Sequence, residues 1–213
     1  EKSPVIGIRQ LAENRTRDRV LTDDEIRDFW FGLDISDMDD MMKRGLKLIL
    51  VTGQRPGEVA SMHRSEIDGC WWTLPGKKVK NGKTHRVYLS DLALRLIGEV
   101  RTEYVIESPK KGQPINTTSL AHSLRRRGMV NMNIEDFRPH DLRRTAATGI
   151  ARLGFSNEVI GRVLNHTVQG VTAIYNRYRY DDQVEEALTS WADLLENEIL
   201  KIQPDMSESD TCQ

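Results

Sequence analysis

The chain has 213 residues, enough for one large domain or two small ones with an ordinary hydrophobic core. Hydrophobic residues make up 38% and charged residues 30%, which excludes a membrane-embedded or fibrous protein, and no run approaches the roughly 18 apolar residues that a bilayer span needs. Cys70 and Cys212 are too few for a disulfide framework or a zinc site, so a reducing cytoplasm is the expected location.

The formal net charge of −1 conceals an uneven distribution of charge. Residues 41–180 hold 24 Lys and Arg against 11 Asp and Glu, whereas residues 1–40 hold 6 against 11 and residues 181–213 hold 1 against 10. A basic middle between acidic ends is compatible with a surface that binds a polyanion. A solvated surface of mixed charge would give the same counts.

The N-terminal segment, residues 1–20, is expected to form a linker. It contains Pro4 and little apolar periodicity, and the chain begins with Glu1, so we expect a further N-terminal domain before it. The first predicted helix follows, because Thr22 and Glu25 make a capping-box pattern. The apolar residues after it recur at helical spacing: Ile26, Phe29, Trp30 and Leu33.

A second helix is predicted to begin at Ser36 or Asp37 and to end at Thr52-Gly53, and a short helix is predicted to begin at Pro56. The apolar positions of the second helix are Met38, Met41, Met42, Leu46 and Ile49. The period then changes: residues 71–74 and 84–89 are predicted strands of a hairpin, with Asn81-Gly82 as a turn signal.

The rest of the chain is predominantly helical in pattern. Ser90 caps one predicted helix, and the others are expected near residues 117–127, 140–153, 156–164, 170–179 and 183–200. The fold class is therefore α+β, mainly α-helical, with a small antiparallel β-sheet. We expect three parts: the linker 1–20, a domain over 21–200, and an acidic tail over 201–213 that is disordered.

Three segments are dense in side chains that can hold or attack a phosphodiester. They are residues 52–58 (TGQRPGE), residues 138–145 (RPHDLRRT), and residues 164–166 (LNH) followed nine residues later by Tyr175. In order and spacing these segments resemble the tyrosine recombinase family, specifically the phage-type integrases. The resemblance covers roughly residues 21–190 and implies that residues 21–200 adopt the tyrosine recombinase catalytic fold.

The resemblance implies a catalytic set, and elementary chemistry agrees with it. Arg55 and Arg143, planar and always charged, suit the non-bridging oxygens of a phosphate in the transition state. Tyr175 is the expected nucleophile, and because a phenol with a pKa of about 10 is protonated at neutral pH, it needs a base. The remaining expected roles are a base at His140, a phosphate hydrogen bond from His166, a general acid at Lys80 and support of Arg55 by Glu58.

Two of these assignments have rivals. Lys80 lies seven residues before Val87, as the family pattern asks, whereas Lys77, Lys78 and Lys83 are expected to contact backbone phosphates. Tyr178 and Tyr180 compete with Tyr175, and the spacing from His166 favours Tyr175.

Further DNA contacts are expected from basic residues near these segments. They are His85, Arg86, Arg125, Arg126, Arg144 and Arg177. His85 also fits packing within its strand. Many relatives have Gly where Asn165 stands and His where Arg144 stands.

The implied function is site-specific DNA recombination, with integration or excision of a mobile element through a 3′-phosphotyrosyl intermediate. We expect no metal, no ATP and no other cofactor. The expected partners are double-stranded DNA attachment sites and accessory DNA-bending or excision factors, in the bacterial cytoplasm at the nucleoid and away from membranes. The protein is expected to be a monomer in solution and a homo-tetramer on DNA through its C-terminal segment, although the apolar stripe of helix 183–200 also fits packing within its own chain. A type IB topoisomerase and a non-catalytic DNA-binding protein are the alternatives.

Overall fold

The computed structural model describes residues 18–79, 81–99, 102–166 and 180–201. The helices of these residues are α1 (Asp23–Ile35), α2 (Asp40–Thr52), α3 (Pro56–Ala60), α4 (Asp91–Ile97), α5 (Thr117–Ser123), α6 (Pro139–Arg152), α7 (Asn157–Val163) and α9 (Asp181–Asp193). Short 3₁₀ turns lie at η1 (Arg64–Glu66), η2 (Gly76–Lys78) and η4 (Met129–Asn131), and π-helical turns at η3 (Leu124–Gly128) and η5 (Leu194–Leu200). None of the helices in the described ranges combines the length and the apolar character that a bilayer crossing demands.

Helix α1 begins as its sequence predicts. The Thr22 hydroxyl accepts from the Glu25 amide, and the Glu25 carboxylate accepts from the Thr22 amide, which completes the capping box. All four residues of the predicted apolar stripe are buried, and Phe29 packs edge-on against Phe137. The predicted inward face of this helix is therefore confirmed.

The predicted start of the second helix at Ser36 or Asp37 is wrong. The Ser36 hydroxyl instead donates to the Leu33 carbonyl at 2.7 Å, and its backbone amide donates to the same carbonyl at 3.1 Å, so Ser36 closes the end of α1. Helix α2 begins only at Asp40, because the Asp39 carboxylate accepts from the Met41 amide at 2.9 Å. It ends, as predicted, at Gly53, whose φ of 67° lies in the left-handed region.

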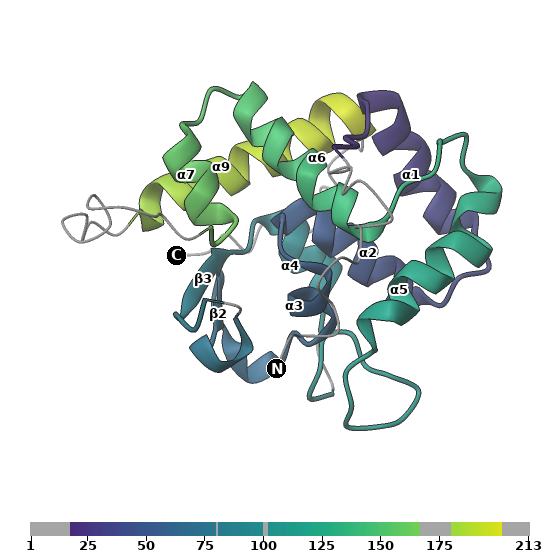
Figure 1. Cartoon of the computed structure of the whole chain (residues 1–213), viewed down its shortest axis with the longest axis horizontal. Helices are drawn as coiled ribbons and strands as arrows, with labels where there is room; N and C mark the ends of the chain where they lie inside the picture. Colours follow the sequence, from purple (N-terminus) through teal and green to yellow (C-terminus); the bar gives the residue numbers. More distant parts are fainter. Residues whose placement is uncertain (1–17, 80, 100–101, 167–179, 202–213) are drawn as a thin grey trace, which may run out of the picture.

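Helix α2 is the centre of the fold. It packs against α1, α3, α4, α5, α6 and α9, and Figure 1 shows it among these helices. Residues 45–52 are buried on every side, which explains the apolar run at 48–51. Because α2 is fixed on all sides, the turn that follows it, which carries Arg55, projects from a rigid element.

The sheet is small and antiparallel, with strand order β1 (Ile67–Asp68), β2 (Trp71–Leu74) and β3 (His85–Tyr88). The β2–β3 hairpin has the predicted strands and lies beside α7 at the margin of the helical body (Figure 1). Trp72 pairs with Val87 on its buried face. Strand β1 was not predicted, since two residues are too few to show an alternating pattern.

The C-terminal helices agree with the predicted ranges, except that two of them divide: the predicted helix 117–127 into α5 and the π-helical turn η3, and the predicted helix 183–200 into α9 and the π-helical turn η5. The predicted helix 170–179 lies outside the described residues. The apolar stripe of α9 and η5 is buried within the same chain, where these elements pack on α1, α2, α4, α6, α7 and β3. For residues 181–200 the structure therefore supports packing within one chain rather than docking onto a second protomer.

Candidate active site

Arg55 is held at the junction between α2 and α3 by Glu58. The Glu58 carboxylate accepts from the Arg55 backbone amide at 3.1 Å and from its guanidinium Nη1 at 2.7 Å. Glu58 is 6% exposed, whereas the Arg55 side chain is 28% exposed. A buried carboxylate thus fixes a guanidinium that still faces solvent.

Arg143 comes from the second turn of α6 and is 4% exposed. Its Nη1 donates to the Gly53 carbonyl at 2.9 Å, and its Nη2 donates to the Leu164 carbonyl at 2.5 Å. Burial, and secondarily the Arg55 guanidinium, lower the pKa of Arg143 to about 10. The side chain therefore stays charged at neutral pH, with its position set by the ends of α2 and α7.

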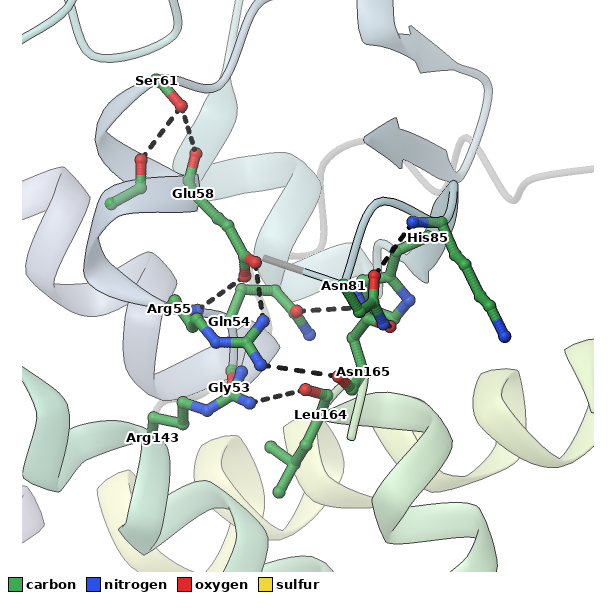
Figure 2. Close-up of polar contacts among 12 residues, drawn as sticks. Gly53, Gln54, Arg55, Glu58, Ser61, Asn81, His85, Arg143, Leu164 and Asn165 are labelled. Atoms are coloured by element: carbon green, nitrogen blue, oxygen red, sulfur yellow. Dashed lines mark hydrogen bonds and ion pairs between the residues drawn. The ribbon is translucent and has the colours of Figure 1, made fainter. Parts of the chain in front are cut away.

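The last residue of α7 and the two residues that follow it present three consecutive carbonyl oxygens to this centre. The Val163 carbonyl accepts from Gln54 Nε2 at 2.8 Å, the Leu164 carbonyl accepts from Arg143, and the Asn165 carbonyl accepts from Arg55 Nη2 at 3.4 Å. Figure 2 shows the two guanidiniums converging on this turn from opposite elements. The structure therefore brings the first and second polar segments together through the backbone of the third.

A buried polar pair lies beneath the arginines. Gln54 is fully buried, and its Oε1 lies 3.2 Å from Nε2 of His85, which is 7% exposed. Burial, and then the charge of Arg143, lower the pKa of His85 to about 4, so its imidazole is neutral at pH 7. The His85 side chain packs under the site, as the other interpretation of this residue has it, and a contact of His85 with DNA stays a prediction.

His140 and His166 flank the arginines and are both exposed. His140 lies in the first turn of α6, and His166 follows the carbonyl turn, where its amide donates to the Gly161 carbonyl at 2.8 Å. Partial burial is the main cause that lowers the pKa of each histidine, and the charges of Arg143 and Arg55 contribute to both. Both imidazoles are therefore neutral at pH 7 and able to accept a hydrogen bond or a proton.

The hairpin turn reaches the same centre through Asn81. Its Nδ2 donates to Oδ1 of Asn165 at 2.8 Å (Figure 2). Asn165 thus contacts Arg55 through its backbone and the hairpin through its side chain. Lys80, Tyr175 and Arg177 lie outside the described residues, as does the rival tyrosine at position 178.

The other residues expected to contact DNA differ in whether their side chains already have partners within the chain. Lys77, Lys83, Arg125 and Arg126 are exposed. Lys78 forms an ion pair with Glu66 and donates to the Ser61 carbonyl. The remaining two also have partners within the chain: Arg144 pairs with Asp141 at 2.6 Å, and Arg86 pairs with Asp181 and stacks over Trp71.

Sequence reasoning missed two contributors to this site, Gln54 and Asn81. Nothing local marks a glutamine that will be buried completely, because its partners at Val163 and His85 are distant in sequence. Asn81 showed only as part of a turn signal, because its partner Asn165 lies 84 positions further along the chain.

The arrangement has the fold of a DNA recombinase catalytic domain. A lambda integrase fragment (residues 75–356), crystallised as a dimer bound to a COC′ core site, superposes with a TM-score of 0.60 at 19% identity over 74% of this chain and 60% of that chain. The lambda integrase catalytic core gives a TM-score of 0.56 at 18% identity over 71% and 94%, and the XerA recombinase gives 0.58 at 21% over 81% and 64%.

The chain belongs to the phage integrase family, whose sequence model matches residues 19–182. It is 32% identical to prophage integrase IntA of Escherichia coli (strain K12) over 155 residues, 68% of this chain and 37% of that protein. It is 25% identical to a tyrosine recombinase of Thermosipho africanus (strain TCF52B) over 180 residues, 82% of this chain and 62% of that protein. The chain therefore spans between about one third and two thirds of these relatives.

Proposed function

We propose that residues 21–200 are the catalytic domain of a tyrosine site-specific recombinase, which cleaves and rejoins DNA during integration or excision of a mobile element. One observation carries the proposal. Arg55 and Arg143, from different parts of the chain, donate to adjacent carbonyls in the turn that leads into His166. Two fixed guanidiniums beside an exposed imidazole suit a phosphodiester in which negative charge increases during reaction.

In the proposed reaction the Tyr175 hydroxyl attacks the scissile phosphorus and forms a 3′-phosphotyrosyl ester. His140, neutral at pH 7, takes the phenolic proton, while the arginines and His166 hold the non-bridging oxygens. The bond from phosphorus to the 5′ oxygen breaks, and Lys80 gives that oxygen its proton. The ester keeps the bond energy, so a 5′-hydroxyl from another strand reverses the step without ATP.

The proposed partners are double-stranded attachment sites and a tetramer assembled on DNA from protomers that are monomeric in solution. A crystallised relative supports this assembly, since lambda integrase forms a tetramer bound to a Holliday junction. The proposed contact between protomers is made by the C-terminal segment, of which the apolar face of α9 and η5 is buried within its own chain. We also propose that accessory DNA-bending or excision factors take part and that the protein acts at the bacterial nucleoid.

The test uses DNA in which a nick lies close to the scissile bond, so that a short strand diffuses away after cleavage and the covalent adduct persists. Since the target sequence is not known, a pool of nicked duplexes with randomised sequence is incubated with the chain at low salt, which favours phosphate contacts. We expect wild type to form an adduct that survives denaturation and Tyr175→Phe to form none. An equal adduct yield from Tyr175→Phe removes this tyrosine as the nucleophile, and relaxation of supercoiled plasmid at no particular site favours the topoisomerase alternative.

A further inference from the structure

Asn165 has a backbone conformation that most residues avoid. Its φ is 49°, and in the described ranges the only other non-glycine residue with positive φ is Lys201. Gly adopts this conformation without steric cost, and Asn tolerates it better than most other residues. The carbonyl that accepts from Arg55 belongs to the backbone, which Gly would supply equally well. The carboxamide of Asn165 therefore needs a separate explanation.

The carboxamide of Asn165 faces the hairpin turn. Its Oδ1 accepts from Asn81 Nδ2 at 2.8 Å, across 84 positions of the sequence. Its own Nδ2 is buried with no hydrogen-bond partner in the structure. Burying the unpaired Nδ2 costs free energy. The hydrogen bond from Asn81 to Oδ1 is the contact of this side chain that offsets the cost.

Asn81 is oriented by its own turn before it meets Asn165. Its Oδ1 accepts from the Lys83 amide at 3.1 Å, and the following Gly82 has a φ of 70°. The turn is also tightly packed, because a β-carbon at Gly76 would lie 2.3 Å from the Gly82 carbonyl oxygen. The carboxamide of Asn81 is thus oriented by its bond to Lys83, and its bond to Asn165 joins Asn81 to the arginine centre.

We propose that Asn165 and Asn81 are positioning residues, whose side-chain hydrogen bond holds the tip of the β2–β3 hairpin at the working distance from Arg55 and His166. This inference rests on the proposed function, in which Lys80, the neighbour of Asn81 in sequence, protonates the leaving 5′ oxygen. Breaking the bond slows proton donation and leaves the grip of the arginines on the phosphate unchanged.

The experiment compares two leaving groups on the duplex recovered from the adduct screen. One substrate has the natural 5′ oxygen at the scissile bond, and the other has sulfur in that position. A thiolate is a far weaker base than an alkoxide, so the sulfur leaves without receiving a proton. The variant is Asn165→Gly, which suits a positive φ and keeps the carbonyl for Arg55, and the matched control is Thr84→Ala, an exposed position in the same hairpin.

With the oxygen substrate, Asn165→Gly is expected to cleave about three- to tenfold more slowly than wild type, the effect of one hydrogen bond. With the sulfur substrate, its rate should equal that of wild type, and Thr84→Ala should match wild type on both. The double variant Asn81→Ala/Asn165→Gly should be no slower than the slower single variant. Thermal unfolding of Asn165→Gly establishes that it is folded.

The inference is overturned if Asn165→Gly cleaves the oxygen substrate at the wild-type rate, or if it is equally slow on both substrates. Additive losses in the double variant also overturn it. Lys80→Ala tests the underlying reaction separately, since it should fail on the oxygen substrate and recover on the sulfur substrate. If Lys80→Ala stays inactive on the sulfur substrate, Lys80 is rejected as the general acid. The rates of the double variant then test only whether Asn81 and Asn165 act through their shared hydrogen bond.

Discussion

Gly149 of α6 and Trp191 of α9 are in direct contact, with the indole ring lying over the glycine backbone. A β-carbon at Gly149 would lie 2.1 Å from Cζ3 of Trp191, and the indole Nε1 donates to the Leu50 carbonyl of α2 at 2.9 Å. This contact joins the C-terminal helix to the central helix and to the helix that carries Arg143. It therefore keeps the C-terminal helix within its own chain.

Gly149→Ala is expected to destabilise the protein by about 1–3 kcal/mol. The indole of Trp191 is held by its hydrogen bond to Leu50, so it cannot move away from the added methyl group without losing that bond. The matched control is Gly161→Ala in α7, where a β-carbon meets nothing within 4 Å. That variant should be stabilised by up to about 1 kcal/mol through the higher helix propensity of Ala. Urea unfolding measures both, and equal stabilities for the two variants would contradict the close contact at Gly149.

Acid is expected to weaken the fold through His85. Its pKa in the folded chain is about 4, below its ordinary 6.5, so the unfolded chain binds more protons between these pH values. The stabilisation is complete above pH 6.5 and decreases toward pH 4 by on the order of 3 kcal/mol. His140 and His166, whose pKa values are also lowered, act in the same direction.

The measurement is urea unfolding at several pH values between 4 and 7 for wild type and His85→Gln. The variant has no group to titrate at this position, so its stability should fall less steeply than that of wild type over the interval. His63→Gln, in a partly exposed position, serves as the control for a generic loss of histidine. Parallel curves for wild type and His85→Gln would show that the buried imidazole is not responsible.

Arg143→Lys is expected to reduce the rate of DNA cleavage about 100- to 1000-fold, although it preserves the charge. The fork of Arg143 donates to the Gly53 and Leu164 carbonyls at once, and an ammonium group cannot reproduce that planar geometry. Single-turnover formation of the covalent adduct measures the effect. Arg152→Lys, at an exposed ion pair with Asp23, should cleave at the wild-type rate. A loss of less than tenfold for Arg143→Lys would show that charge alone suffices.

Cleavage is expected to proceed at an unchanged rate in excess EDTA. Arg55 and Arg143 together supply the positive charge that a divalent ion would otherwise bring to the phosphate, and both are fixed by protein groups. The rate of adduct formation is measured with and without the chelator, and then with added Mg²⁺. A rate that disappears in EDTA and returns with Mg²⁺ would contradict the role of the two arginines.

The sequence predicted helices and strands correctly where the residues that specify them lie within a few positions of one another. The capping box at Thr22 and Glu25, the apolar stripe of α1 and the strands of the hairpin depend on local hydrogen bonds and on residue spacing. The start of α2 failed for a related reason, since Ser36, Asp37 and Asp39 are all competent caps. In the structure Asp39 caps α2, while Ser36 bonds back to Leu33 and Met38, which is 3% exposed, packs in the core.

The sequence by itself determined the family, the main helices and the hairpin, and it supplied the candidate residues for the proposed reaction on a phosphodiester. The tertiary structure decided how those residues are held: the arginines on consecutive carbonyls, the neutral His85 on buried Gln54, and Asn81 on Asn165. It also decided that the C-terminal helix packs on its own chain. The physical reason is that these contacts join residues far apart in the chain, so their geometry depends on the path of the whole backbone.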